Sequence, residues 1–174
     1  MSELFTLNSA VAIGVGITAC VTDLRSRRIP NMLTFGAAGA ALAYGVATGG
    51  WTGLGSAALG WGIGALAFIV PFALGGLGGG DVKLLAALGA WLGPVGAFWV
   101  ALYAGVAGGV MALLVALATG SLRRALSNVS LLLMHWRVWG LRPVSEVSLE
   151  GSEGPRLAYA LPIFAGLVAT LWLR

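Results

Sequence analysis

Two aspartates, Asp23 and Asp81, are the residues of this chain whose type and isolation point to chemistry. They are the only acidic residues between positions 4 and 145, a stretch that is otherwise mostly apolar. An ionisable side chain inside a membrane segment is costly and marks a functional site by default. Two carboxylates that approach each other cannot both ionise cheaply, so they share one proton. The ionised carboxylate can then deprotonate a water molecule while the protonated one polarises a carbonyl group, which is chemistry suited to peptide hydrolysis.

Each aspartate also has a structural interpretation. Asp81 follows the glycine-rich stretch 75–80 and precedes an apolar run, as an N-cap residue of a helix would. Asp23 could simply pair with Arg27 one helical turn later, although a carboxylate at a helix C-terminus opposes the helix dipole. The glycines suit either a tight membrane re-entry turn or a backbone that rearranges around a bound segment. Lys83 projects from a different face than Asp81, so we expect it to anchor at lipid headgroups.

The composition is that of a helical membrane protein. Of the 174 residues, 59% are hydrophobic and only 9% are charged, with a mean hydropathy of +0.94. A soluble domain is about 25% charged. The length favours one membrane-embedded domain over residues 1–174. The net charge of +4 does not indicate a nucleic-acid partner, because the basic residues are distributed as topology markers. The single cysteine, Cys20, excludes an intrachain disulfide, and no Cys/His set suits zinc.

Six apolar segments predict an all-α bundle of six transmembrane helices. They cover about residues 4–23, 32–48, 54–74, 81–92, 95–118 and 157–173, and Gly49-Gly50 and Gly93-Pro94 mark two of the turns. The fourth segment is short, because about twelve residues span only about 18 Å of helix. Residues 122–139 repeat their apolar side chains at helical spacing and predict an amphipathic helix in the membrane interface, with Gly140 as its stop. We expect this helix and the polar loop after it, about residues 119–156, on the cytoplasmic side.

The arginines fix the expected orientation. Arg25, Arg27 and Arg28 lie in the connection between the first and second segments, and Arg123 and Arg124 follow the fifth segment. Arginine-rich turns stay on the cytoplasmic side, so both termini are expected outside. The end of the first helix and the start of the fourth then meet at the cytoplasmic membrane face. This topology predicts that the two aspartates converge there.

The motifs around both aspartates resemble the intramembrane aspartyl proteases, and specifically the prepilin peptidases. Gly78-Gly79-Gly80-Asp81 fits the Gly-x-Gly-Asp motif of these proteases. The segment that continues to Gly89 is similar to the prepilin peptidase branch, as is Asp23 followed by Arg28-Ile29-Pro30-Asn31. Residues 157–162 resemble a looser proline-containing motif of the last helix.

The resemblance implies a leader peptidase for type IV pilin-like precursors, cutting at the cytoplasmic face of a prokaryotic inner membrane. It implies that Asp23 and Asp81 are the catalytic pair, with no metal and no cofactor. Gly78, Gly80, Lys83, Pro30 and Asn31 carry over as motif residues that support the site or the substrate. The expected partners are prepilin-like precursors and the lipid bilayer, with no nucleic acid. The first loop lacks the paired Cys-x-x-Cys motifs of bifunctional members, so the chain resembles the short, peptidase-only members that serve Flp pili, and methyltransferase activity is not expected.

Two other classes of function stay open. A small proton- or ion-coupled transporter would also need carboxylates in the membrane, although here both aspartates are expected at one face. A non-catalytic subunit of a membrane assembly would not need them. Glu146, Glu150 and Glu153 could attract a basic leader peptide, but a solvated loop is the simpler interpretation.

Overall fold

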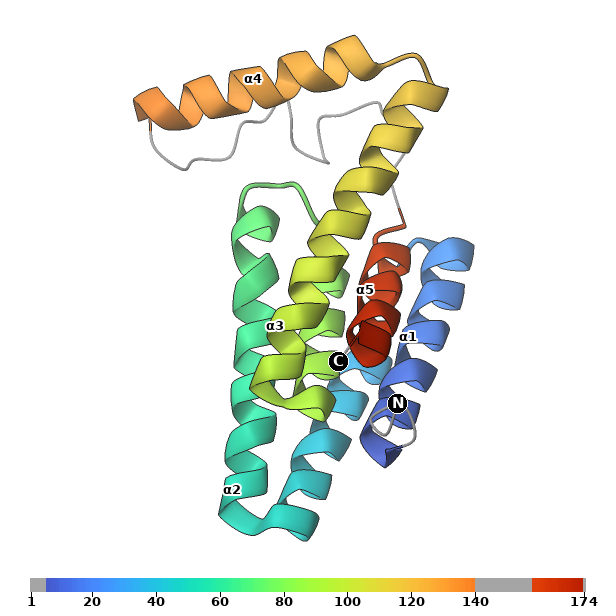
Figure 1. Ribbon diagram of the computed structural model, residues 1–174, viewed down its shortest axis with the longest axis vertical. Helices are drawn as coiled ribbons and strands as arrows, with labels where there is room; N and C mark the ends of the chain where they lie inside the picture. Colours follow the sequence, from blue (N-terminus) through green and yellow to red (C-terminus); the bar gives the residue numbers. More distant parts are fainter. Residues whose placement is uncertain (1–5, 140–157, 174) are drawn as a thin grey trace.

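The computed structural model describes residues 6–139 and 158–173, and within these ranges every regular element is a helix. The helices are α1 (Leu7–Ser26), α2 (Asn31–Ala73), α3 (Gly79–Ala118), α4 (Leu122–Trp139) and α5 (Ala160–Leu173). Figure 1 shows α1, α2, α3 and α5 in one bundle, with α4 lying across one end of it. The predicted all-α fold is therefore confirmed.

Both long helices are broken where the sequence predicts turns. Gly50 has φ 57° and ψ −137°, and Gly93 has φ 71° and ψ −179°. Glycine adopts positive φ without steric cost, whereas other residues rarely do. Pro94 then suits the start of the next helical stretch, because its fixed φ is already helical. The chain reverses at both points, so α2 and α3 are each drawn as two stretches joined by a bend (Figure 1).

Glycines bring the backbones of α2 and α3 into direct contact. A Cβ atom on Gly60 would overlap the Gly89 carbonyl oxygen, and a Cβ atom on Gly89 would overlap that of Gly60. One turn further along α2, a Cβ atom on Gly64 would lie 2.5 Å from the Leu85 carbonyl oxygen. Small residues permit such close approach between membrane helices. Residues 84–91 of α3 are consequently all buried. They belong to the short fourth segment predicted from the sequence, which is enclosed by protein.

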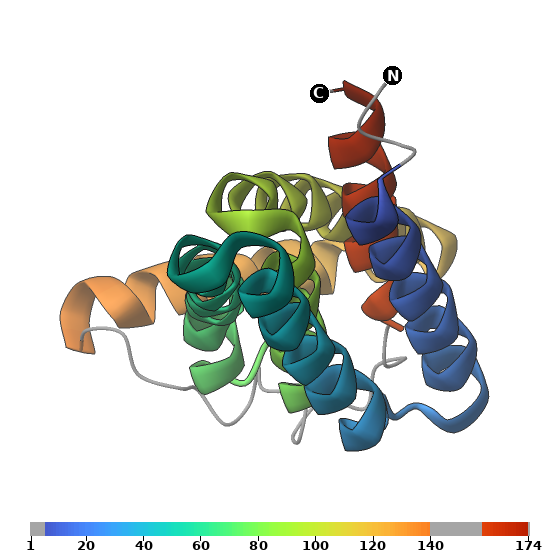
Figure 2. The same cartoon turned by 90° about the horizontal axis from the view of Figure 1, so that it is seen from below.

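Helix α5 packs against both α3 and α1, and Figure 2 shows α1 and α5 side by side. Glycines again set the spacing. A Cβ atom on Gly16 of α1 would lie 2.6 Å from the Phe164 ring, and one on Gly166 of α5 would lie 2.5 Å from the Ala104 backbone nitrogen. The central core contains Leu84, Leu88, Ile163 and Leu167 among its fully buried side chains.

The outer surface of the bundle is apolar, as expected for a membrane protein. Helices α1, α2 and α3 are each long and apolar enough to cross a membrane, and α5 is a shorter apolar helix of 14 residues. Large hydrophobic side chains stand exposed on the bundle, among them Trp51, Leu59, Leu66 and Leu114. Lipid contact accounts for such a surface. The number of membrane crossings, six by the sequence, stays a prediction.

The helix predicted over residues 122–139 is present as α4 (Leu122–Trp139). Leu126 and Val129, two members of its predicted apolar stripe, are exposed. Its position in the membrane interface stays a prediction. Gly140, the predicted stop, and the polar loop up to residue 156 lie outside the described residues.

Candidate active site

Asp81 is positioned by the glycine loop between α2 and α3. The end of α2 is closed by hydrogen bonds from the Gly75 and Gly76 N–H groups to the Phe72 and Pro71 carbonyl oxygens, and Gly75 has φ 78°. The chain then enters α3, where Asp81 occupies the third position of the first turn. Its Oδ2 atom accepts a hydrogen bond of 3.1 Å from the Gly78 N–H group. Asp81 therefore caps the helix, and its side chain is only 8% exposed.

The three glycines before Asp81 do not have equal space around them. A Cβ atom on Gly78 would lie 3.1 Å from the Asp81 Oδ2 atom, and one on Gly80 would lie 3.3 Å from the Ile29 Cβ atom. Both distances are shorter than an ordinary contact of about 3.5–4.0 Å between carbon atoms. A Cβ atom on Gly79 would meet the Phe72 ring at 3.4 Å, which is nearly ordinary. Close contacts thus distinguish Gly78, which lies against Asp81, and Gly80, which lies against Ile29, from Gly79.

Asp23 reaches the same region from the last turn of α1. It is also 8% exposed, and its Oδ2 atom accepts a hydrogen bond of 3.3 Å from the N–H group of Ala160, the first residue of α5. Cys20, one turn earlier on the same helix, donates its thiol to the Ala160 carbonyl oxygen at 3.3 Å. These two bonds fasten the start of α5 to the end of α1. They involve residues 137 and 140 positions apart.

The Asp23 and Asp81 carboxylates lie close enough for their charges to interact. In Figure 1 the end of α1 and the starts of α3 and α5 lie in the half of the bundle nearer α4. Each carboxylate accepts a backbone N–H at the start of a helix, where the helix dipole favours negative charge. The arrangement supplies a base and an acid that could act on one water molecule and one carbonyl group.

The other predicted motif residues lie at and near the starts of α2 and α3. Pro30 caps the start of α2, where its carbonyl oxygen accepts the Thr34 N–H group at 3.3 Å. Lys83 Nζ donates a hydrogen bond of 3.0 Å to Asn31 Oδ1, and it stands 5.4 Å from the centroid of the Phe35 ring. Lys83 thus joins the first turn of α3 to the first turn of α2. The structure gives it protein partners in addition to the headgroup role expected from the sequence.

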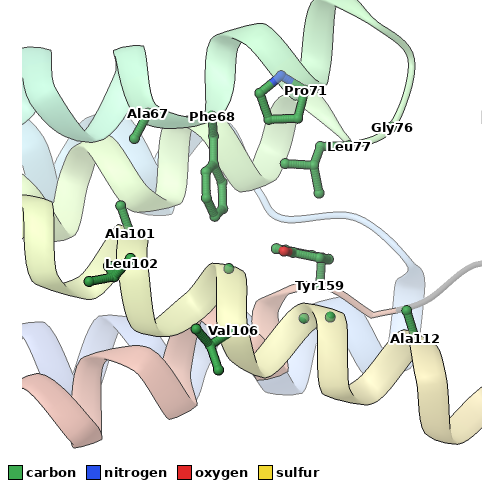
Figure 3. Close-up of a pocket in the computed structure, with 13 residues that line it drawn as sticks. Ala67, Phe68, Pro71, Gly76, Leu77, Ala101, Leu102, Val106, Ala112 and Tyr159 are labelled. Carbon is green, nitrogen blue, oxygen red and sulfur yellow. The ribbon is translucent and has the colours of Figure 1, made fainter. Parts of the chain in front are cut away.

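An apolar groove of about 690 Å³ opens next to the glycine loop. Its walls are the last turns of the second stretch of α2, the loop, and the second stretch of α3, and Tyr159 forms one side (Figure 3). The lining residues are Ala67, Phe68, Pro71, Gly76, Leu77, Ala101, Leu102, Gly105, Val106, Gly108, Gly109, Ala112 and Tyr159. Among the residues that the structure describes, no charged side chain lines this groove.

Sequence reasoning did not identify Tyr159, Cys20 or the groove as parts of the site. The available signal for Tyr159 was its place in residues 157–162, which resemble the proline-containing motif of the last helix. For Cys20 it was the three-residue spacing to Asp23, which puts both side chains on one helix face. The groove has no local signal, because separate stretches of α2 and α3 form it. Within residues 6–139 and 158–173, no three His, Cys, Asp or Glu side chains gather as a metal site would require.

A comparison with protein-family models matches residues 10–113 to the type IV leader peptidase family. Neither the curated proteins nor the solved structures gave a significant match. The matched range covers more than half of the chain and contains both aspartates, the motif Arg28-Ile29-Pro30-Asn31 and the glycine loop. The chain therefore belongs to the type IV leader peptidase family, and it is a membrane peptidase.

Proposed function

We propose that this protein is an aspartyl endopeptidase that removes the leader peptide of type IV pilin-like precursors, with Asp23 and Asp81 as its catalytic pair. The observation that carries the proposal is the meeting of these two carboxylates. They come from α1 and α3, both are 8% exposed, and they are close enough to interact electrostatically. Within the described residues they are also the only acidic side chains. The family supports the substrate class.

The proposed reaction needs both protonation states of the pair. The ionised aspartate takes a proton from a water molecule as the water oxygen attacks the scissile carbonyl carbon. The protonated aspartate gives its proton to the carbonyl oxygen, so a tetrahedral diol forms between the two carboxyl groups. Collapse of the diol breaks the C–N bond: the aspartate that took the water proton gives it to the leaving amine, and one diol hydroxyl group gives its proton to the other aspartate. Each carboxyl group thereby returns to its starting state, and one proton remains on the pair.

We propose that the site faces the cytoplasm. Arg25, Arg27 and Arg28 follow Asp23 in the turn between α1 and α2, and basic residues favour the cytoplasmic side. Figure 1 shows this turn at the end of the bundle nearer α4. A site at the membrane surface gives water access, so the substrate need not be unwound deep in lipid. The end of α1 at Ser26 and the start of α2 at Asn31 leave a short connection, which supports a peptidase without a methyltransferase insertion there.

The test is cleavage of a pilin-like precursor by purified protein in detergent or liposomes. Wild type should shorten the precursor at its leader junction. Asp23→Asn and Asp81→Asn should each lower the rate at least about 100-fold, because positioned acid–base groups contribute about 10²–10⁴-fold. Asparagine keeps the shape of the side chain and an oxygen that can accept the Gly78 or Ala160 N–H group, so the fold should persist.

Glu3→Gln is the matched control, because it replaces a carboxylate by an amide at the other end of the first predicted helix. It should cleave at the wild-type rate. Normal trimming by either aspartate variant would overturn the catalytic assignment. Ion flux in liposomes that needs both aspartates, without any cleavage, would instead favour a transporter.

A further inference from the structure

Tyr159 connects the apolar groove to the two aspartates. Its neighbour in the chain is Ala160, whose N–H group is bonded to Asp23, and its hydroxyl lies within range of the Asp81 charge. On the groove side its ring meets the Phe68 ring edge-on, with centroids 5.7 Å apart and planes at 72°. Figure 3 shows the Tyr159 side chain extending into the space between α2 and α3. Tyr159 therefore lines the groove and lies within electrostatic range of the aspartate pair.

A glycine on α3 makes room for this tyrosine. A Cβ atom on Gly108 would overlap the Tyr159 hydroxyl group and lie 2.6 Å from the ring atom that carries it. Gly105 and Gly109, which also line the groove, have no atom within 4 Å of a Cβ atom. Of these three groove glycines, only Gly108 is needed to seat the tyrosine.

The Tyr159 hydroxyl group has no hydrogen-bond partner within residues 6–139 and 158–173, and it is not sealed from the groove. A phenol hydroxyl group that is accessible from the groove can both donate and accept a hydrogen bond. The rest of the groove is lined by hydrocarbon side chains and glycines. A peptide held there would leave its main-chain N–H and C=O groups without partners, at a cost in binding free energy. Of the described residues that line the groove, the tyrosine is the one with a polar side chain.

We propose that Tyr159 is a substrate-binding residue of this peptidase: its hydroxyl group hydrogen-bonds the main chain of a precursor lying in the groove, beside the bond that the aspartates cleave. The inference rests on the proposed function, because it assumes an extended peptide at Asp23 and Asp81. The groove leads into the glycine loop at Gly76 and Leu77, five and four residues before Asp81. Its uncharged lining suits the apolar segment that follows a leader peptide.

Tyr159→Phe tests the hydrogen bond, because it removes only the hydroxyl group and keeps the ring against Phe68. One hydrogen bond of ordinary strength corresponds to about 2- to 12-fold in affinity. We expect KM for the precursor to rise by that factor, kcat to stay within about twofold, and the melting temperature to be unchanged. The Kd of a fluorescent precursor for the Asp81→Asn protein should rise equally when Tyr159→Phe is added. Tyr103→Phe, which removes the same atom from a tyrosine stacked on Trp99 outside the groove, is the control.

Unchanged KM and Kd in Tyr159→Phe would overturn the inference, as would a lower kcat at unchanged KM. A wild-type protein that binds the precursor but never cleaves it would refute the proposed function. In that case the Kd comparison would still decide the role of Tyr159 in binding.

Gly109→Leu tests where the precursor lies. The leucine has open space in the free protein but would fill part of the groove. KM should rise more than tenfold while the melting temperature is maintained. Gly62→Leu, at another glycine without atoms within 4 Å but outside the groove, should leave KM unchanged. Equal kinetics for the two leucine variants would place the precursor elsewhere and overturn the inference.

Discussion

Replacing Gly78 by alanine should displace the Asp81 carboxylate while the loop keeps its fold. Gly78 has φ −81° and ψ 147°, an extended conformation open to any L-residue, so an alanine adds no backbone strain. Its Cβ atom would nevertheless lie 3.1 Å from Asp81 Oδ2. An ordinary contact needs about 3.5 Å or more, so the carboxylate must move by roughly 0.4 Å.

The size of the effect follows from this displacement. A misplacement of about 1 Å can cost about 10²-fold in rate, so roughly 0.4 Å corresponds to about 6-fold on a logarithmic scale. We expect kcat for leader cleavage to fall about 3- to 10-fold in Gly78→Ala. The hydrogen bond from the Gly78 N–H group to Asp81 would lengthen at the same time.

Gly79→Ala is the matched control, because it adds the same methyl group one residue later. Its Cβ atom would meet only the Phe72 ring, at 3.4 Å, so kcat should stay within about twofold of wild type. Single-turnover cleavage of a purified precursor gives the rate, and thermal unfolding in detergent confirms that both variants fold. Equal rates in the two variants would refute the steric reasoning, as would a Gly78→Ala loss explained by unfolding.

Two further predictions concern packing. Gly60→Ala should destabilise the protein by about 1–3 kcal/mol, the usual cost of overpacking. The added Cβ atom would meet the Gly89 backbone, which cannot move aside as a side chain can. Gly62→Ala, with open space around it, is the control and should unfold at the wild-type temperature in the same thermal assay. Lys83→Met should lose the hydrogen bond to Asn31 and lower stability by only about 0–1 kcal/mol, since the lysine is partly solvated. A melting point for Gly60→Ala equal to that of Gly62→Ala would contradict the close helix contact, and a loss of several kcal/mol in Lys83→Met would contradict a minor structural role.

The helices and their breaks followed from local sequence. Turns were predicted at Gly49-Gly50 and Gly93-Pro94, and in the structure Gly50 and Gly93 have the positive φ angles that glycine readily adopts. The end of α1 was harder to place: the prediction ended the segment at Asp23, whereas the helix continues to Ser26 and closes with Arg27 at φ 53°. Arginine tolerates this conformation poorly, so no turn signal marked it.

The candidate site was predicted in outline. Topology placed Asp23 and Asp81 at one membrane face, and the structure brings them within electrostatic range. Asp81 was also considered as the N-cap residue of its helix, which is wrong in position: Gly78 is the N-cap, and Asp81 lies at the third helical position, from which its carboxylate accepts the Gly78 N–H group. The cap and the proposed catalytic role are therefore compatible. The partner of Asp23 was missed, because the Ala160 N–H group lies 137 residues away in the chain.

By itself, the sequence determined that this is a helical membrane protein with two isolated acids, because composition, apolar run length and glycine positions act locally along the chain. Only the tertiary structure decided which backbone groups hold those acids and that Tyr159 borders an apolar groove beside them. The physical reason is that these contacts depend on how closely α1, α2, α3 and α5 approach one another. That distance is set by pairs of glycines, such as Gly60 and Gly89, whose partnership appears only when the helices pack.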